Sequence, residues 1–128
     1  MHKALLLLTL MSFWPAARSA ELPQSAVWEI DHLLGALGSS NCRFYRNGTW
    51  YTASDAQAHL TKKYEYLRKK KLLGSAEDFI TGAGTESSRS GRPYQVQCEQ
   101  QDAVPSAVWL QAALRRLRSG TSSIAGPK

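Results

Sequence analysis

Metal-binding side chains are scarce in this sequence. Its 128 residues include two cysteines and three histidines, and the cysteines stand far apart at positions 42 and 98. His32 and His59 fall in different predicted helices. Structural metal sites usually bring their ligands in close pairs such as Cys-x-x-Cys. We therefore expect neither a metal nor another cofactor.

Long hydrophobic runs are also missing. No stretch approaches the roughly 20 apolar residues of a membrane-spanning helix. The longest run, Ala4–Trp14, follows the basic start His2-Lys3 and precedes small residues at Ala17-Arg18-Ser19. This pattern predicts a cleaved signal peptide over residues 1–19, with cleavage after Ala20 as the alternative. No cysteine lies near the cleavage point, which disfavours a lipid-anchored protein.

The charge of the mature chain is modest. Removal of Lys3 and Arg18 with the signal peptide leaves 14 of the 16 basic residues against 10 acidic residues, a net charge of +4. One dense basic run follows the predicted second helix: Arg68, Lys69, Lys70 and Lys71. It is either a solvated helix end or a contact for an anionic surface such as phospholipid headgroups or a polyanionic glycan. No nucleic-acid motif is present, so nucleic acid is not an expected partner.

A β-hairpin is the clearest element of the sequence. Two aromatic, β-favouring runs flank Asn47-Gly48, a dipeptide typical of two-residue type I′ turns. This turn predicts the opposed pairs Arg46 and Thr49, Tyr45 and Trp50, Phe44 and Tyr51, and Arg43 and Thr52. The alternating run Tyr94–Cys98 predicts a third antiparallel strand.

The two cysteines, Cys42 and Cys98, are expected to form a disulfide between the first and third strands. Cysteines of an exported protein usually pair. The bridge would close a loop of about 57 residues and stabilise the domain by about 4 kcal/mol in the chain-entropy model. Because the mature domain is small, this contribution is comparable with its whole expected stability.

Four helices are predicted around these strands. The first covers about residues 25–37 with Ser25 as its cap, and the second begins at a capping-box pattern formed by Ser54 and Gln57. The third starts after Ser75 and ends near residues 84–86, and the last follows Ser106. We expect one α+β domain over residues 20–118, with a three-stranded antiparallel sheet and a flexible tail at 119–128.

Polar residues in three places suggest a binding site. The loop from Thr85 to Pro93 sets the serines Ser87, Ser88 and Ser90 beside arginines, and such hydroxyl and guanidinium donors could hold an anion. His59 and Lys63 share one stripe of the second helix. The hairpin adds Arg43, Tyr45, Arg46 and Trp50, expected to form an aromatic and cationic face that either contacts a ligand or is covered by a helix.

An enzymatic alternative uses Ser88 or Ser90 as nucleophile with His59 as base. Its local context is weak, because Ser88 occupies the position where a nucleophile elbow before Ser90 would have glycine. The mature chain also contains no Ser-x-x-Lys pair and no evident pair of carboxylates for glycoside hydrolysis. A non-catalytic function is therefore favoured over a small hydrolase.

An ordered set of short motifs resembles the YfeK-like family of small exported bacterial proteins, a domain of unknown function. The motifs are Arg46-Asn47-Gly48, Ala56 with His59-Leu60 and Lys63-Tyr64, Ala76-Glu77 with Phe79-Ile80, Ser87-Ser88 with Ser90-Gly91, and Pro93-Tyr94. The resemblance covers roughly residues 30–117. It implies a periplasmic α+β domain of a Gram-negative envelope and supplies no reaction.

The resulting prediction is a non-catalytic binding or interaction module of the envelope. Its expected binding residues are Arg46, Asn47, His59, Lys63, Ser87, Ser88 and Ser90.

Overall fold

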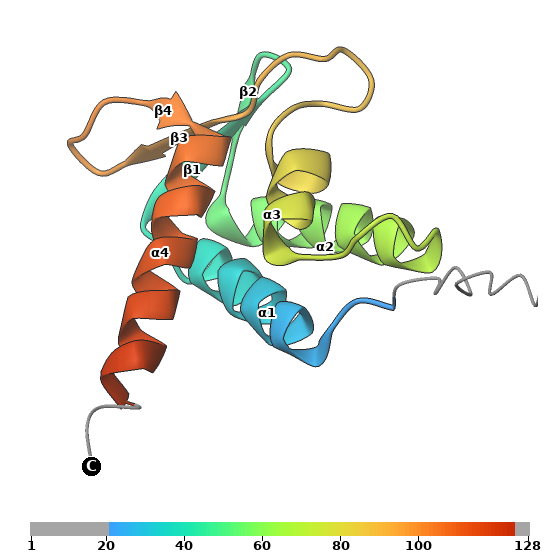
Figure 1. The fold of residues 1–128 in the computed structure, drawn as a ribbon. Helices are drawn as coiled ribbons and strands as arrows, with labels where there is room; N and C mark the ends of the chain where they lie inside the picture. Colours follow the sequence, from blue (N-terminus) through green and yellow to red (C-terminus); the bar gives the residue numbers. More distant parts are fainter. Residues whose placement is uncertain (1–20, 125–128) are drawn as a thin grey trace, which may run out of the picture.

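The computed structural model describes residues 21–124, with side chains to residue 120 (Figure 1). The predicted signal peptide at 1–19 and the final residues 125–128 lie outside this range. The elements in chain order are α1 (Gln24–Gly38), β1 (Cys42–Arg46), β2 (Thr49–Tyr51), α2 (Ala53–Lys69), α3 (Ala76–Phe79), the π-helix η1 (Ile80–Gly84), β3 (Gln95–Cys98), β4 (Val104–Pro105) and α4 (Ser106–Ile124). The predicted α+β class is confirmed.

The antiparallel sheet has four strands in the order β2-β1-β3-β4, so the prediction of three strands is wrong. The added strand β4 pairs Val104 with Val96 and Pro105 with Gln95. A strand of two residues is too short to show an alternating pattern in the sequence. Its proline is tolerated because β4 lies at the sheet edge, where the missing N–H breaks no ladder.

The hairpin and its register are confirmed at the three pairs that the strands contain. Phe44 lies opposite Tyr51, Tyr45 opposite Trp50 and Arg46 opposite Thr49. Asn47 and Gly48 have φ angles of 48° and 88°, the positive values that a type I′ turn requires at both positions.

The predicted disulfide is also confirmed. Cys42 and Cys98 are directly opposed on β1 and β3, with their Cα atoms 4.0 Å apart, and their sulfurs are bonded. The bridge therefore locks the register of the two central strands at one end.

The hydrophobic core lies between the sheet and the helices. The inward sides of β1 and β3 bury Phe44 and Val96, and the apolar stripe of α2 buries Leu60 and Tyr64. In Figure 1, α1 and α2 lie below the sheet, with α4 beside them. The helices contribute most of the remaining buried core: Ile30, Leu33, Leu37, Phe79, Ile80 and Leu110.

Two helix starts differ from the prediction. Pro23, not Ser25, precedes α1, and its carbonyl accepts hydrogen bonds from the N–H groups of Ala26 and Val27. The chain becomes helical at Gln24 without a side-chain cap, because the fixed φ of proline suits the entry to a helix.

The second helix also begins early. The Thr52 hydroxyl, rather than Ser54, caps α2 by accepting a hydrogen bond from the Asp55 N–H at 3.2 Å. Thr52 therefore caps the N–H three residues after it, whereas the predicted box would have used Ser54 and the Gln57 N–H two residues further along. The predicted cap at Ser75 is confirmed, since its hydroxyl accepts from the Asp78 N–H.

Helix α4 continues to Ile124, six residues into the predicted tail at 119–128. Gly120 does not end the helix, because a single glycine weakens a helix by only about 1 kcal/mol, and no proline lies between Ser106 and Ile124. The predicted end of the third helix falls in η1, where Gly84 packs against the Leu110 side chain so closely that a Cβ would collide with it.

Candidate functional site

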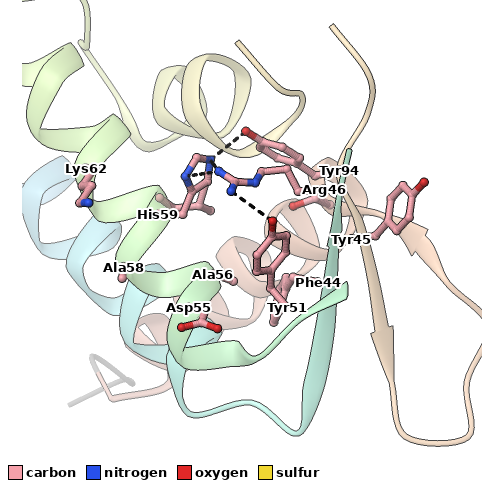
Figure 2. A pocket seen from close by; sticks show the side chains of 12 residues that line it. Phe44, Tyr45, Arg46, Tyr51, Asp55, Ala56, Ala58, His59, Lys62 and Tyr94 are labelled. Atoms are coloured by element: carbon pink, nitrogen blue, oxygen red, sulfur yellow. Dashed lines mark hydrogen bonds between the residues drawn. The ribbon is translucent and has the colours of Figure 1, made fainter. Parts of the chain in front are cut away.

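Three segments that are distant in sequence bring the candidate site together. Arg46 ends β1, His59 and Lys63 lie one turn apart on α2, and Tyr94 immediately precedes β3. The β1–β3 register pairs Tyr45 with Gln95, so the next position places Arg46 beside Tyr94. Figure 2 shows the Arg46 guanidinium pointing toward His59 and Tyr51, with the Tyr94 hydroxyl above the imidazole.

Arg46 lies on the inner side of the hairpin, which corrects the prediction that it shares an outer face with Arg43, Tyr45 and Trp50. Its pairing with Thr49 places it on the same side as Phe44, two residues earlier, because strand side chains alternate. The other three form a separate outer cluster, in which Tyr45 contacts Trp50 and the Arg43 guanidinium lies 5.5 Å from the Trp50 ring centroid. In Figure 2 the Tyr45 side chain points away from Arg46 and His59.

Arg46 fixes the tautomer of His59. The Arg46 Nη1 atom lies 2.7 Å from His59 Nδ1, and the Arg46 Nη2 atom donates to the Tyr51 hydroxyl at 3.4 Å. Because a guanidinium can only donate, we assign Nδ1 as the acceptor and place the ring proton on Nε2. Nε2 lies 3.0 Å from the Tyr94 hydroxyl and donates to it. In this tautomer the approach of 3.2 Å between Nη1 and Nε2 is not a hydrogen bond, because both nitrogens are donors.

His59 is held in its neutral form. Burial first, and then the positive charges of Arg46, Lys63 and Lys62, together lower the pKa of its imidazole to about 4. The imidazole therefore acts at neutral pH as a hydrogen-bonding bridge between Arg46 and Tyr94, without a charge of its own.

Lys63 completes the cluster from the next turn of α2. Its ammonium donates to the Glu86 carbonyl oxygen at 2.9 Å and to the Tyr94 hydroxyl at 3.2 Å. Burial lowers the pKa of Lys63; the Glu86 carboxylate opposes this shift, and the nearby Arg46 adds to it. The Tyr94 oxygen thus accepts from both His59 and Lys63, which leaves its own O–H proton available to a ligand.

The predicted serines have different positions and partners. Ser87 is 5% exposed, and its hydroxyl oxygen accepts from Asn47 Nδ2 at 3.0 Å and from the N–H groups of Arg89 and Ser90. The Ser90 hydroxyl donates to Asn47 Oδ1 at 2.5 Å. Asn47, Ser87 and Ser90 therefore tie the loop to the hairpin turn, while Ser88 is exposed and lines the cavity.

The Ser–His arrangement of a hydrolase is not formed. Within residues 21–124, the hydrogen bonds of His59 go to Arg46 and Tyr94, and none joins it to Ser88 or Ser90. The Ser90 hydroxyl donates its proton to Asn47 Oδ1 instead of to His59.

Two adjoining cavities open around this cluster. The first, which we call the polar cavity, has a volume of about 570 Å³. It is lined by Arg46, Asn47, Tyr51, His59, Lys63, Ser87, Ser88, Arg89 and Tyr94. The second, the apolar cavity, has a volume of about 500 Å³. It is lined by Phe44, Tyr45, Arg46, Tyr51, Asp55, Ala56, Ala58, His59, Leu60, Lys62, Tyr94 and Ser106. The cavities share Arg46, Tyr51, His59 and Tyr94, so they are halves of one cleft.

The positive charges that line the polar cavity are balanced only in part, by the carboxylate of Glu86 near Lys63. Neither Arg46 nor Lys63 forms an ion pair in the part of the chain that the structure describes; the ion pairs there join Arg118 to Glu29 and Glu77. Arg89 brings a third cation to the lining. Cations that are partly buried and lack a carboxylate partner favour the entry of an anion.

The basic run Arg68–Lys71 is separate from the cleft. It lies at and just after the C-terminal end of α2, about 15 Å along the helix from His59 at 1.5 Å per residue. Its four side chains are exposed, and Arg68 stacks on and donates to Tyr64. Contact of this run with an anionic surface stays a prediction.

The described residues contain neither a metal-binding cluster nor a membrane-spanning helix. Among residues 21–124, no group of three or more His, Cys, Asp or Glu side chains is placed to hold a metal ion. No helix in the same range has the length and apolar character needed to cross a membrane.

Sequence reasoning missed Tyr51, Tyr94 and Arg89 as lining residues. Tyr51 and Tyr94 could have been predicted to share the inner face of the sheet. The predicted register places Tyr51 opposite Phe44, and Tyr94 belongs to the alternating run that ends at Cys98. What the sequence did not show was which helix would face them.

Comparison with known proteins places the chain in a family of unknown function. No curated protein and no solved structure matches it. One family model matches residues 24–118, well over half of the sequence, and nothing in that match connects the chain with the YfeK-like proteins by name. The chain belongs to the family of unknown function DUF5329.

Proposed function

We propose that this protein is a non-catalytic binding module of the bacterial envelope, and that its polar cavity holds a small anion. One observation carries the proposal: Arg46 and Lys63 flank a neutral His59, and neither forms an ion pair with a carboxylate among the described residues. Charge-assisted hydrogen bonds from such donors are roughly twice as strong as neutral ones. A cavity of this size with a few convergent polar groups is typical of small-molecule sites.

The chemistry of the cluster favours binding over catalysis. Both ring nitrogens of His59 are engaged, and the neighbouring cations make the imidazole a poor base. A general base works best with a pKa near the operating pH, whereas His59 has a pKa of about 4. The free O–H of Tyr94 and the cations remain as donors for a bound oxyanion.

We also propose that the protein is located in the periplasm. It rests on the signal-peptide pattern at 1–19 and on the resemblance to the YfeK-like proteins. The Cys42–Cys98 disulfide supports it, because such bonds persist in oxidising compartments.

Calorimetric titration with inorganic phosphate tests the proposal. The variant Lys63→Gln should bind phosphate about tenfold more weakly or worse, since it loses a charged donor worth about 1.5–3 kcal/mol. Lys69→Gln is the matched control, because it removes the same charge from an exposed site on the same helix and should change affinity little.

Two outcomes would contradict the proposal. One is the absence of saturable phosphate binding by the wild-type protein at low ionic strength. The other is an equal loss of affinity in Lys63→Gln and Lys69→Gln, which would indicate general electrostatic attraction rather than a site.

A further inference from the structure

The apolar cavity continues the cleft beyond the cations. Its walls include Phe44 from β1 and Ala56 and Leu60 from α2, all buried. Arg46 and His59 line both cavities, so a group held at Arg46 would have apolar side chains directly beside it. This continuity extends the proposed anion site into a second compartment of different chemistry.

Ser106 places a polar group in the apolar cavity. It is the first residue of α4, its side chain is 2% exposed, and it lines the cavity. Its backbone N–H donates to the Tyr94 carbonyl, and none of the side-chain hydrogen bonds within residues 21–124 engages its hydroxyl. No buried side-chain polar atom of the described residues lacks a partner, so this hydroxyl is open to solvent in the cavity, where a ligand can replace water. The N-terminus of the 19-residue helix α4 adds a partial positive charge beside it. Both features favour a ligand atom that accepts a hydrogen bond.

Tyr94 spans the distance between the cationic end of the cleft, at Arg46 and Lys63, and its other polar end, at Ser106. Its carbonyl accepts from the Ser106 N–H at 2.8 Å, while its hydroxyl meets His59 and Lys63. The ends are therefore separated by about the length of a tyrosine side chain. Asp55 also lines the apolar cavity, and its carboxylate would repel an anionic group there and direct it to Arg46.

From these observations we infer the class of ligand: an organic anion with an apolar body about as long as one aromatic ring and a second polar group at the far end. The anionic end binds Arg46, Lys63 and the Tyr94 hydroxyl. The body packs on Phe44 and Leu60, and the far group bonds the Ser106 hydroxyl. This inference rests on the proposed anion site and adds the apolar body and the second polar group of the ligand.

A short series of carboxylates tests it by calorimetric titration of the full protein: acetate, benzoate and 4-hydroxybenzoate. Benzoate should bind about tenfold more tightly than acetate, because its ring leaves water. The hydroxyl of 4-hydroxybenzoate should add a further gain of about threefold to tenfold. Ser106→Ala should abolish that last gain while leaving the affinity for benzoate within about twofold, and Lys63→Gln should weaken all three.

The outcomes separate the inference from the proposed function. If acetate and phosphate bind but benzoate is no tighter than acetate, the apolar compartment is not used and the inference is wrong. If benzoate is favoured but the extra hydroxyl gives no gain, the role of Ser106 is wrong; the wild-type comparison of these two ligands decides this even if Ser106→Ala fails to fold. If no anion binds, the proposed function itself fails.

Discussion

His59 lies between the guanidinium of Arg46 and the turn of α2 that carries Lys63. An imidazole in such surroundings cannot gain a proton without placing a third positive charge beside two others. Its neutral state lets Nδ1 accept from Arg46, and this hydrogen bond holds the guanidinium in the cleft. The charge state of one residue thus controls the position of the donor that we propose to bind the anion.

The stability of the protein should fall in acid because of His59. Its pKa is about 4 when folded and 6.5 in the unfolded reference, so below pH 6.5 the unfolded chain binds the proton better. The stabilisation from the neutral imidazole is complete above pH 6.5 and is lost as the pH falls toward 4. We expect a loss of about 1–2 kcal/mol, because partial solvent exposure screens the larger value that the shift alone would give.

Urea unfolding at pH 7 and pH 4 measures this effect. The variant His59→Gln keeps a polar side chain but cannot titrate, so its stability should fall by about 1–2 kcal/mol less than that of the wild type over the same interval. Identical pH dependence in the two proteins would show that His59 does not carry the expected shift. The comparison cancels the contributions of the carboxylates, which both proteins share.

The turn between β1 and β2 joins the hairpin to the loop that follows η1. Asn47 adopts a φ of 48° in the turn, and its amide bonds the hydroxyls of Ser87 and Ser90. The turn conformation and the loop contact therefore support each other. Gly48, at a φ of 88°, provides the second positive angle.

Two glycines give a matched test of this turn. Neither Gly48 nor Gly35 has an atom within 4 Å of the place that a Cβ would occupy, but Gly35 lies in α1, whereas Gly48 is in the left-handed region. Gly48→Ala should destabilise the protein by about 1–2 kcal/mol. Gly35→Ala should stabilise it by about 0.5–1 kcal/mol. Urea unfolding measures both, and equal effects would mean that the turn is not strained as described.

At the scale of elements, most of the sheet was predictable and its edge was not. The hairpin register followed from Asn47-Gly48 and the third strand from alternation up to Cys98. Strand β4 has only two residues, so its existence depends on pairing with β3, which no local pattern encodes. The start at Thr52 was missed because Thr52 and Ser54 have similar capping chemistry, and the start at Pro23 because α1 has no side-chain cap to recognise.

The whole molecule uses one strand pair for stability and for the site. The disulfide at Cys42 and Cys98 closes one end of β1–β3, and Arg46 and Tyr94 lie four residues away at the other end. A fixed register at the bridge thus fixes the distance between the guanidinium and the phenol. α2 then supplies His59 and Lys63 across the cleft.

The candidate site was only partly predictable at this scale. The sequence indicated Arg46 from the hairpin, and His59 and Lys63 from one stripe of the second helix. It did not indicate Ser106, which reaches the cleft only because β4 and α4 fold back onto Tyr94. Such a contact depends on tertiary packing and leaves no periodic signal in the chain.

The most direct test of the anion site is a ¹⁵N NMR titration of His59 with and without inorganic phosphate. The account predicts a neutral ring protonated at Nε2, a pKa of about 4 without phosphate, and a clear rise when phosphate neutralises the charges of Arg46 and Lys63. The ring signals of His32, on α1, should not respond and serve as the internal control. A pKa near 6.5 that phosphate does not change would contradict the account.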